Sequence, residues 1–395
     1  MREGNATIAA VTELELSVVI PALDEERTIA HCVEKALAAV AALGGRGEVL
    51  VADNGSTDRT RSIAESLGAR VVAVEGRGYG RALRGGFSAA RGKYLVMADA
   101  DGSYDFAQAP RFVEELRAGR DFVIGNRYEG GIAPGAMPFL NRYLGTPVLT
   151  GVMNLLFSTG IGDVNCGMRG LTKEAFARLG LKADGMEFAT EMVVKASLLG
   201  LSIAEVPCPL AKDLRGRPPH LRRWRDGWRH LRFMLLFSPT GTFLAPGAAL
   251  CALGALTLLA VTGRDALAPD AAAWLGSRHA LTGLLLWLTG TSVLGLGAVA
   301  QEADYQERFD AGNAVARFLH KTFRLERGLI LGAALSAAGL LALAYFPISF
   351  YTNLLPRGGD ALRLDLAVLA IAAVLTGVQC AFASFALGLL TLRVK

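Results

Sequence analysis

Four long uncharged segments in the C-terminal part of the chain restrict its fold more than any other feature. None contains Asp, Glu, Lys, Arg or His, and each has about the 20 residues that a helix needs to cross a bilayer. They are Phe243–Thr262, Leu281–Ala300, Leu329–Tyr351 and Leu366–Leu392. Buried helices of a large soluble core are the alternative, but such a core does not need four of these segments in close succession. We therefore predict an all-α domain with four transmembrane helices over residues 239–395, and a composition with 52% hydrophobic and 19% charged residues agrees.

The positive charge of the chain is concentrated just before the first of these segments. The whole chain has a formal net charge of +5, whereas Lys212 to Arg232 contain eight basic and two acidic residues, a local charge of +6. Apolar residues including Trp224 and Trp228 recur there at helical spacing beside a row of arginines, which predicts an amphipathic helix within residues 212–238. Such a helix suits the headgroup region of a bilayer with anionic lipids. This placement of charge indicates a membrane surface as the partner and no nucleic acid.

Basic residues near the ends of the four segments also predict an orientation. They are frequent before the first segment and in the loop 301–327, and sparse in the two alternate loops. By the positive-inside rule the N-terminal domain, this loop and the tail Arg393–Lys395 face the cytoplasm. We expect an integral protein of a bacterial cytoplasmic membrane with both termini on the cytoplasmic side.

The N-terminal 211 residues alternate short β-rich runs with helical patterns. The predicted strands are Leu16–Ile20, Glu48–Asp53, Arg70–Val74, Tyr94–Ala98 and Asp121–Gly125. The helical patterns begin near Glu25, Thr57, Tyr79 and Ala107. This alternation predicts an α/β domain over residues 1–211 in which helices cover both faces of a parallel sheet. In such sheets ligands bind beyond the carboxyl ends of the strands.

Two carboxylates, Asp99 and Asp101, leave the fourth predicted strand together. They follow the apolar run Tyr94–Ala98, where uncompensated charge would be costly. A hard divalent cation such as Mg²⁺ or Mn²⁺, held by one or two carboxylates and by phosphate oxygens, would compensate them. Structural capping by these side chains is the alternative. Their position at a strand end favours the metal site.

Short motifs follow several of the predicted strands. They are VVIPALDEE at Val18–Glu26, DNGSTD at Asp53–Asp58, DAD at Asp99–Asp101, GNRY at Gly125–Tyr128, DVNCGMR at Asp163–Arg169 and MEFATEM at Met186–Met192. In this order and spacing they resemble the family 2 glycosyltransferases, which have the GT-A fold, a Rossmann-like mixed sheet. The last three make the chain similar to the branch of dolichol-phosphate mannosyltransferases and polyprenyl-phosphate glycosyltransferases. An appended membrane domain is common in this branch.

The resemblance implies a pocket for a nucleotide sugar. Pro21, Ala22 and Glu25 would line this pocket, and Asp53 would hydrogen-bond the base. Asn54 stands where the family commonly has a second Asp, so the identity of the nucleotide stays open between UDP and GDP.

The donor diphosphate would lie near the carboxylates of the fourth strand. The resemblance implies that Asp99 and Asp101 hold the metal-bound diphosphate, and Ser103 is a candidate for a third ligand. The turn Gly76–Gly80 leads into a helix and offers Arg77 or Arg81 to the donor phosphates.

An acceptor phosphate needs cations more than it needs a base, because it is already an anion at neutral pH. Arginine binds phosphate in a bidentate way and keeps its charge. The candidates for this role are Arg127, Arg142, Arg169, Arg215 and Arg217, of which Arg127 and Arg169 are also candidates for catalysis beside Asp101. Asp163 is expected near the reacting centre, either as a base or as the carboxylate that orients an arginine. Surface salt bridges are the alternative for each arginine.

The expected function is transfer of a hexose, such as glucose or mannose, from a UDP- or GDP-linked donor to a polyprenyl phosphate with inversion. The acceptor would be undecaprenyl or dolichyl phosphate, and a homo-oligomer is compatible with the sequence. A processive polysaccharide synthase is the first alternative, but Thr190–Met192 and His220–Trp224 only approximate the motifs of that class. A non-enzymatic lipid-binding or transport module is the second, although the four spans lack the charged residues that transport pathways usually need.

Overall fold

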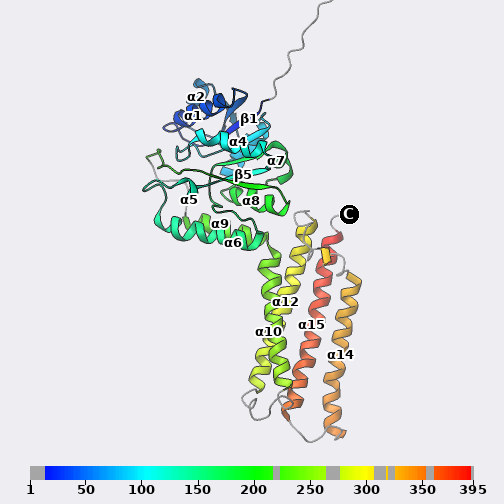
Figure 1. Ribbon diagram of the computed structural model, residues 1–395. Helices are drawn as coiled ribbons and strands as arrows, with labels where there is room; N and C mark the ends of the chain where they lie inside the picture. Colours follow the sequence, from blue (N-terminus) through cyan, green and yellow to red (C-terminus); the bar gives the residue numbers. More distant parts are fainter. Residues whose placement is uncertain are drawn as a thin grey trace, which may run out of the picture. The chain divides into compact units, whose positions relative to one another are not determined.

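The chain forms two compact units that divide between Met234 and Leu235. The structure is a computed structural model that describes residues 14–216, 223–263, 276–306, 317–318, 325–352 and 360–392 (Figure 1). Several basic residues used in the sequence-based predictions lie outside these ranges. They are Arg217, Arg222, Arg264, Arg308, Lys321, Arg324, Arg357 and the tail 393–395.

The first unit is built on a seven-stranded mixed sheet in the order β3-β2-β1-β4-β6-β5-β7. The strands are β1 (Leu16–Ala22), β2 (Gly47–Asp53), β3 (Arg70–Ala73), β4 (Tyr94–Met97), β5 (Phe122–Asn126), β6 (Arg169–Thr172) and β7 (Ile203–Pro207). The five predicted strands correspond to β1 through β5. The predicted GT-A-like mixed sheet is confirmed, because β6 runs antiparallel to β4 and β5. β6 and β7 are short and carry polar residues, so the sequence pattern does not reveal them. The first five strands alone alternate with helices, and this alternation predicts a parallel sheet.

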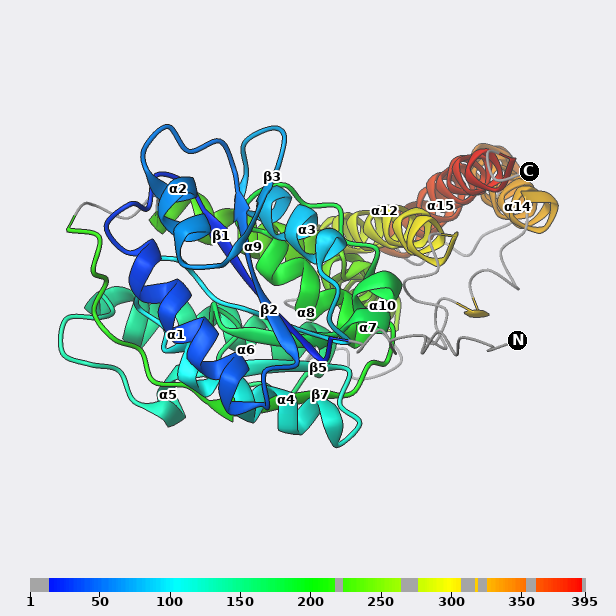
Figure 2. The same ribbon diagram turned by 90° about the horizontal axis from the view of Figure 1, so that it is seen from above.

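Helices cover both faces of this sheet. The helical segments of the unit are α1 (Ile29–Ala42), α2 (Thr60–Ser66), α3 (Tyr79–Ala89), η1 (Phe106–Gln108), α4 (Ala109–Arg117), α5 (Arg127–Gly130), η2 (Asn141–Gly145), α6 (Thr146–Phe157), α7 (Lys173–Leu179) and α8 (Phe188–Leu198). α1 and α4 pack on one face, and α3 packs on the other with α8 beside it (Figure 2). Gly86 of α3 lies against Val19 and Ala52, where an added Cβ would be only 2.5 Å from Val19 Cγ1. β1 and β4, which lie between these layers of helices, are buried along their whole length.

The basic stretch before the membrane segments is helical over α9 (Arg223–Leu236). Residues 212–216 precede it as an irregular segment, so the described part of the predicted amphipathic region is shorter than residues 212–238. Trp228 is exposed, whereas Asp226 and His230 are buried. The face of the helix that carries Asp226 and His230 is thus buried in the first unit.

The second unit contains four long apolar helices, as predicted. They are α10 (Ala245–Thr262), which continues η3 (Thr240–Leu244), α12 (Ser277–Gln306), α14 (Leu325–Thr352) and α15 (Asp360–Leu392). The segments long and apolar enough to span a membrane are Thr240–Thr262, Arg278–Asp304, Leu325–Tyr345 and Leu366–Leu390. α10 packs on α12, α12 on α15, and α14 on α15.

Small and polar residues join these helices. An added Cβ at Gly254 would lie 2.5 Å from the backbone nitrogen of Trp287, so glycine permits the close approach of α10 and α12. Between α12 and α15, Gln379 accepts a hydrogen bond from Thr291 at 2.5 Å and donates one to Ser292 at 2.8 Å. In hydrocarbon such bonds satisfy polar groups that have no water.

Candidate active site

A cleft of about 1040 Å³ opens in the first unit beyond the carboxyl ends of β1 and β4. Eight of the residues predicted for the site line it: Pro21, Ala22, Glu25, Asp99, Asp101, Ser103, Arg127 and Arg215. The fold therefore brings residues from positions 21 to 215 to one place. This is the location at which sheets of this kind bind ligands.

Asp99 and Asp101 form the acidic end of the cleft. Asp99 Oδ1 accepts a hydrogen bond of 2.9 Å from the hydroxyl of Tyr79. Burial and the neighbouring charge of Asp101 raise the pKa of Asp99 to about 6. A carboxylate disfavoured in this way gains most from a nearby cation.

Ser103 is occupied with Asp101 itself. Its backbone nitrogen and its hydroxyl both donate to Asp101 Oδ1, at 2.9 and 2.6 Å. In the part of the chain that the structure describes, no three His, Cys, Asp or Glu side chains form a metal-binding group. The two aspartates nevertheless suit Mg²⁺ or Mn²⁺, because these ions take one or two carboxylates and complete their shell with phosphate oxygens and water. Ser103 positions Asp101 in this arrangement.

The expected nucleotide residues differ in how they meet the cleft. Glu25 lines it and accepts a hydrogen bond from the Thr28 hydroxyl at 3.1 Å. Asp53 is fully buried and does not line the cleft, because it accepts hydrogen bonds from Arg61 Nε at 2.6 Å and from the nitrogen of Gly55 at 3.1 Å. Burial opposes ionisation of Asp53, but hydrogen bonds from Ser56 and Arg61 hold its pKa below the usual value. As folded, the Asp53 carboxylate caps its own loop and is not presented to a base.

Asn54 lines the cleft next to Asp53. Its amide donates to the carbonyl of Gly76 at 2.6 Å and accepts from the nitrogen of Gly78 at 2.6 Å. Asn54, at which the sequence departs from the motif that it resembles, thereby fixes the turn before α3. Arg77, in the same turn, is exposed and does not line the cleft, and Arg81 pairs with Asp184.

Arg215, a candidate for binding the acceptor phosphate, lies at the acidic end of the cleft. Its Nε is 2.8 Å from Glu25 Oε1, and its Nη2 is 3.6 Å from Asp101 Oδ2. Its Nη1 is 3.9 Å from Asp213 Oδ2. Arg215, predicted to contact an acceptor phosphate, thus lies beside Glu25 and Asp101, two residues predicted for the donor.

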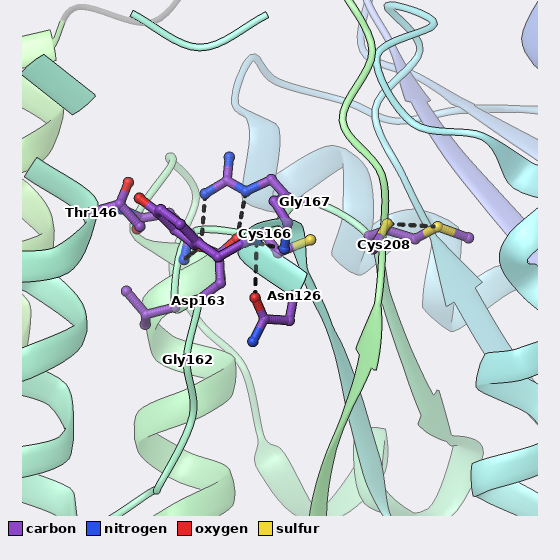
Figure 3. Close-up of polar contacts among 12 residues, drawn as sticks. Asn126, Thr146, Gly162, Asp163, Cys166, Gly167 and Cys208 are labelled. Carbon is purple, nitrogen blue, oxygen red and sulfur yellow. Dashed lines mark hydrogen bonds and ion pairs between the residues drawn. The ribbon is translucent and has the colours of Figure 1, made fainter. Parts of the chain in front are cut away.

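Arg127 and Asp163 form a buried bidentate pair. Figure 3 shows Asp163 near Asn126, the residue that precedes Arg127 in the chain. Arg127 Nε and Nη2 donate to the two oxygens of Asp163 at 2.6 and 2.7 Å, and the Arg127 backbone nitrogen donates to the same carboxylate at 3.1 Å. Arg127 is at the start of α5, directly after β5, where Asn126 caps the helix through the nitrogens of Tyr128 and Glu129. Of the two predicted roles for Asp163, the geometry supports that of orienting an arginine.

Arg169 does not reach the cleft. It is fully buried on β6, and its guanidinium donates to the carbonyls of Cys166 at 2.9 Å, Val164 at 2.9 Å and Ala189. Burial lowers the pKa of this guanidinium. With three backbone carbonyls as partners, Arg169 connects β6 to α8 and is not available to a phosphate or to catalysis in this arrangement.

Arg142 also lies outside the residues that line the cleft, with its guanidinium 5.5 Å from the ring centre of Tyr143. Its carbonyl accepts a hydrogen bond of 2.7 Å from the Tyr128 hydroxyl. Arg217, the other expected phosphate contact, lies outside the described residues.

Other residues of the cleft were not predicted. Tyr79 and Tyr104 line it, and the Tyr104 hydroxyl accepts a hydrogen bond of 2.8 Å from the nitrogen of Gly167. α9 contributes Arg225, Asp226, Gly227, Arg229 and His230. The row of arginines along α9 is the sequence feature that marks these residues. By itself it predicts a surface for lipid headgroups and not a wall of the cleft.

α6 combines a cleft face with an exposed apolar face. Thr146 and Leu149 line the cleft, whereas Val148 and Leu155 are exposed, Leu155 to 81%. The preceding residues continue the exposed row with Phe139, Leu140, Tyr143 and Leu144. An apolar surface of this kind beside a cleft marks a contact with lipid or protein.

Comparison with known proteins identifies both parts of the chain. The model of glycosyl transferase family 2 matches residues 17–180, and the model of the glycosyltransferase family 2 C-terminal transmembrane region matches residues 298–391. The low-salt glycan biosynthesis hexosyltransferase Agl6 of Haloferax volcanii is 37% identical over 376 residues, which are 94% of this chain and 88% of that protein. A dolichyl-phosphate hexose transferase of the same organism is 32% identical over 49% of this chain and 82% of its own.

Among solved structures, the chain is similar to glucosyl-3-phosphoglycerate synthase from Mycobacterium tuberculosis, which was crystallised with Mn²⁺, UDP and glucosyl-3-phosphoglycerate. It is 24% identical and covers 56% of this chain and 78% of its own, with a TM-score of 0.43.

Proposed function

The chain belongs to glycosyl transferase family 2, with that family's C-terminal transmembrane region, and from this premise we propose that it transfers a hexose from a UDP- or GDP-linked donor to a polyprenyl phosphate. The reaction inverts the anomeric centre and takes place at the cytoplasmic face of the membrane. The observation that carries the proposal is that one cleft holds the Asp99–Asp101 carboxylates and the oriented guanidinium of Arg127.

The donor binds at the ends of β1 and β4. Asp99 and Asp101 would hold Mg²⁺ or Mn²⁺, which would supply positive charge against the leaving diphosphate. Tyr79 and Ser103 fix the orientation of the two carboxylates through the hydrogen bonds described above. Pro21, Ala22 and Glu25 shape the pocket for the nucleotide.

The acceptor phosphate approaches from the side of Arg127. An oxygen of the phosphate forms the bond to the anomeric carbon while the bond from that carbon to the donor diphosphate breaks, and the diphosphate keeps the electron pair. Because the attacking oxygen is already an anion, no side chain has to remove a proton. Arg127 orients this phosphate, and Asp163 is a positioning residue that fixes Arg127.

Two features support a lipid as the carrier of this phosphate. The described part of the chain has four helices that are long and apolar enough to span a membrane, and α6 continues from the cleft to an exposed apolar face. The name of the dolichyl-phosphate hexose transferase among the relatives agrees. Arg225 and Arg229, which line the cleft from α9, add cations on the path of an anionic headgroup.

The proposal is tested with membranes that contain the full chain, radiolabelled UDP- and GDP-sugars, and undecaprenyl or dolichyl phosphate. We expect label in a lipid that mild acid cleaves, and a loss of about 100-fold or more in Asp101→Asn, because removal of one electrostatic stabiliser of developing charge has that effect. Asp105→Asn is the matched control, since Asp105 does not line the cleft: it pairs with Lys35 at 3.1 Å and caps η1 through the nitrogen of Ala107 at 3.1 Å, a bond that asparagine can also accept.

Two results would contradict the proposal. Label found only in a long polymer would make the protein a processive synthase. Full activity of Asp101→Asn would remove the metal site from the mechanism.

A further inference from the structure

The chain segment before α9 carries one arginine into the acidic end of the cleft. The nitrogen of Leu214 donates to the carbonyl of Asp101 at 3.0 Å, and the nitrogen of Ala211 donates to the carbonyl of Ser103 at 2.9 Å. Gly102 has a φ of +75°, and a Cβ added there would be 2.7 Å from Leu214 Cδ1. The loop after β4 therefore fixes the backbone that holds Arg215.

Arg215 is surrounded by carboxylates. Its side chain is only 14% exposed, and Glu25, Asp101 and Asp213 lie within 4 Å of its guanidinium, at 2.8, 3.6 and 3.9 Å. Carboxylates this close to one another repel, and buried ones need a cation. Arg215 supplies such a cation to these three carboxylates.

The contact of Arg215 with Asp101 involves a particular oxygen. Ser103 donates twice to Asp101 Oδ1, which leaves Oδ2 turned toward the guanidinium. Oδ2 is therefore the oxygen through which Asp101 would bind a metal ion. The guanidinium is also nearer to Glu25, at 2.8 Å, than to Asp101, at 3.6 Å, so it can leave Asp101 while it stays paired with Glu25.

We propose that Arg215 occupies the place of the divalent cation at Asp101 Oδ2, and that metal binding is an exchange in which Arg215 releases this carboxylate. The inference rests on the metal site of the proposed function and changes the expected role of Arg215, which was assigned to the acceptor phosphate. Arg215 is thus a positioning residue on the donor side.

This exchange makes binding of the metal and of the diphosphate cooperative. The metal alone must displace a cation from an acidic cluster, so it binds weakly. A diphosphate that arrives with the metal offers negative charge to the released guanidinium, so each ligand strengthens the binding of the other. The cleft then holds the metal firmly only when donor is present.

The test is Mn²⁺ binding to the solubilised full chain without nucleotide, measured from the electron paramagnetic resonance of free Mn²⁺. Arg215→Gln should bind Mn²⁺ about tenfold more tightly than wild type, because a competing charge at about 4 Å has been removed. Arg215→Lys keeps the charge and should stay within about threefold of wild type. Arg70→Gln, which removes an arginine paired with Glu48 at 2.9 Å and not in the cleft, should not change the affinity.

Equal or weaker Mn²⁺ binding by folded Arg215→Gln would overturn the exchange. Asp101→Asn separates this failure from that of the proposed function: if neither wild type nor Arg215→Gln shows binding that depends on Asp101, the metal site fails and the exchange fails with it.

Discussion

Two arginines that line the same cleft, Arg127 and Arg215, pair with aspartates in different ways. Arg127 meets Asp163 through two hydrogen bonds of 2.6 and 2.7 Å, and the side chain of Asp163 is fully buried. Arg215 approaches Asp101 only to 3.6 Å, and both side chains are 14% exposed. The first pair has the geometry of a fixed unit, whereas the second is a loose contact between charges that also have other partners.

This difference corresponds to the two tasks of the proposed reaction. The proposed acceptor side has to present one guanidinium in a constant orientation, which a bidentate pair provides. The proposed donor side has to admit a cation and a diphosphate and release them in each cycle, so a tight internal pair there would compete with the ligands. Variants of the two sides should therefore fail in different ways.

Asp163→Asn should have the largest effect, because it leaves the buried charge of Arg127 without its counter-ion. We expect a loss of about 3–5 kcal/mol in the free energy of unfolding, together with loss of sugar transfer. Chemical denaturation of the solubilised protein measures the first, and the radiolabel assay the second. Glu115→Gln breaks an exposed pair with Arg120, at 3.8 Å, and should cost less than about 1 kcal/mol. If Asp163→Asn were as stable as wild type, the fixed character of the pair would be refuted.

Tyr79→Phe should have a smaller effect, confined to the donor side. It removes the hydrogen bond to Asp99 and leaves Asp101 untouched. A hydrogen bond to a charged group contributes about 1.5 kcal/mol, so the apparent affinity for Mn²⁺ should fall about tenfold while kcat at saturating Mn²⁺ is retained. A loss of kcat with unchanged metal affinity would show that Tyr79 acts elsewhere. Tyr94→Phe, on buried β4 itself, is the control.

The sequence was sufficient to predict that Asp99 and Asp101 lie together in the cleft, and to predict the four long helices. Asp99 and Asp101 follow β4 directly, so their position depends only on where an apolar strand ends. The transmembrane helices follow from length and lack of charge in the same local way. Both predictions use neighbouring residues and no long-range contact.

The roles of the arginines depended on contacts that the sequence does not reveal. Arg215 meets Glu25 across 190 positions, and the partner of Asp53 turned out to be Arg61. Arg169 was expected to reach a phosphate, but three backbone carbonyls satisfy it inside the fold. Arginine is usually exposed, and nothing local distinguishes a buried one. β6, which carries Arg169, is not predicted either, because a strand of only four residues has no recognisable pattern of its own.

The smallest effect is expected from a neutral contact on the acceptor side, where α9 meets α8. His230 Nδ1 lies 2.6 Å from the hydroxyl of Thr190, and the ring is buried. Burial and, after it, the charge of Arg169 lower the pKa of His230 from its usual 6.5. The unfolded chain therefore binds the proton more readily, so stability present above about pH 6.5 is lost as the pH falls toward the folded pKa.

The free energy of unfolding should thus decrease between pH 7.5 and 5.5, by no more than about 1.4 kcal/mol per pH unit from this residue. His230→Gln should flatten the decrease, whereas His31→Gln, at an exposed position of α1, should leave it as in wild type. An unchanged slope in His230→Gln would contradict the assignment. The contact between His230 and Thr190 carries no charge at neutral pH. Its loss should therefore alter neither the affinity for Mn²⁺ nor the Arg127–Asp163 pair. A change in metal binding would show that the two sides of the cleft are coupled through α9.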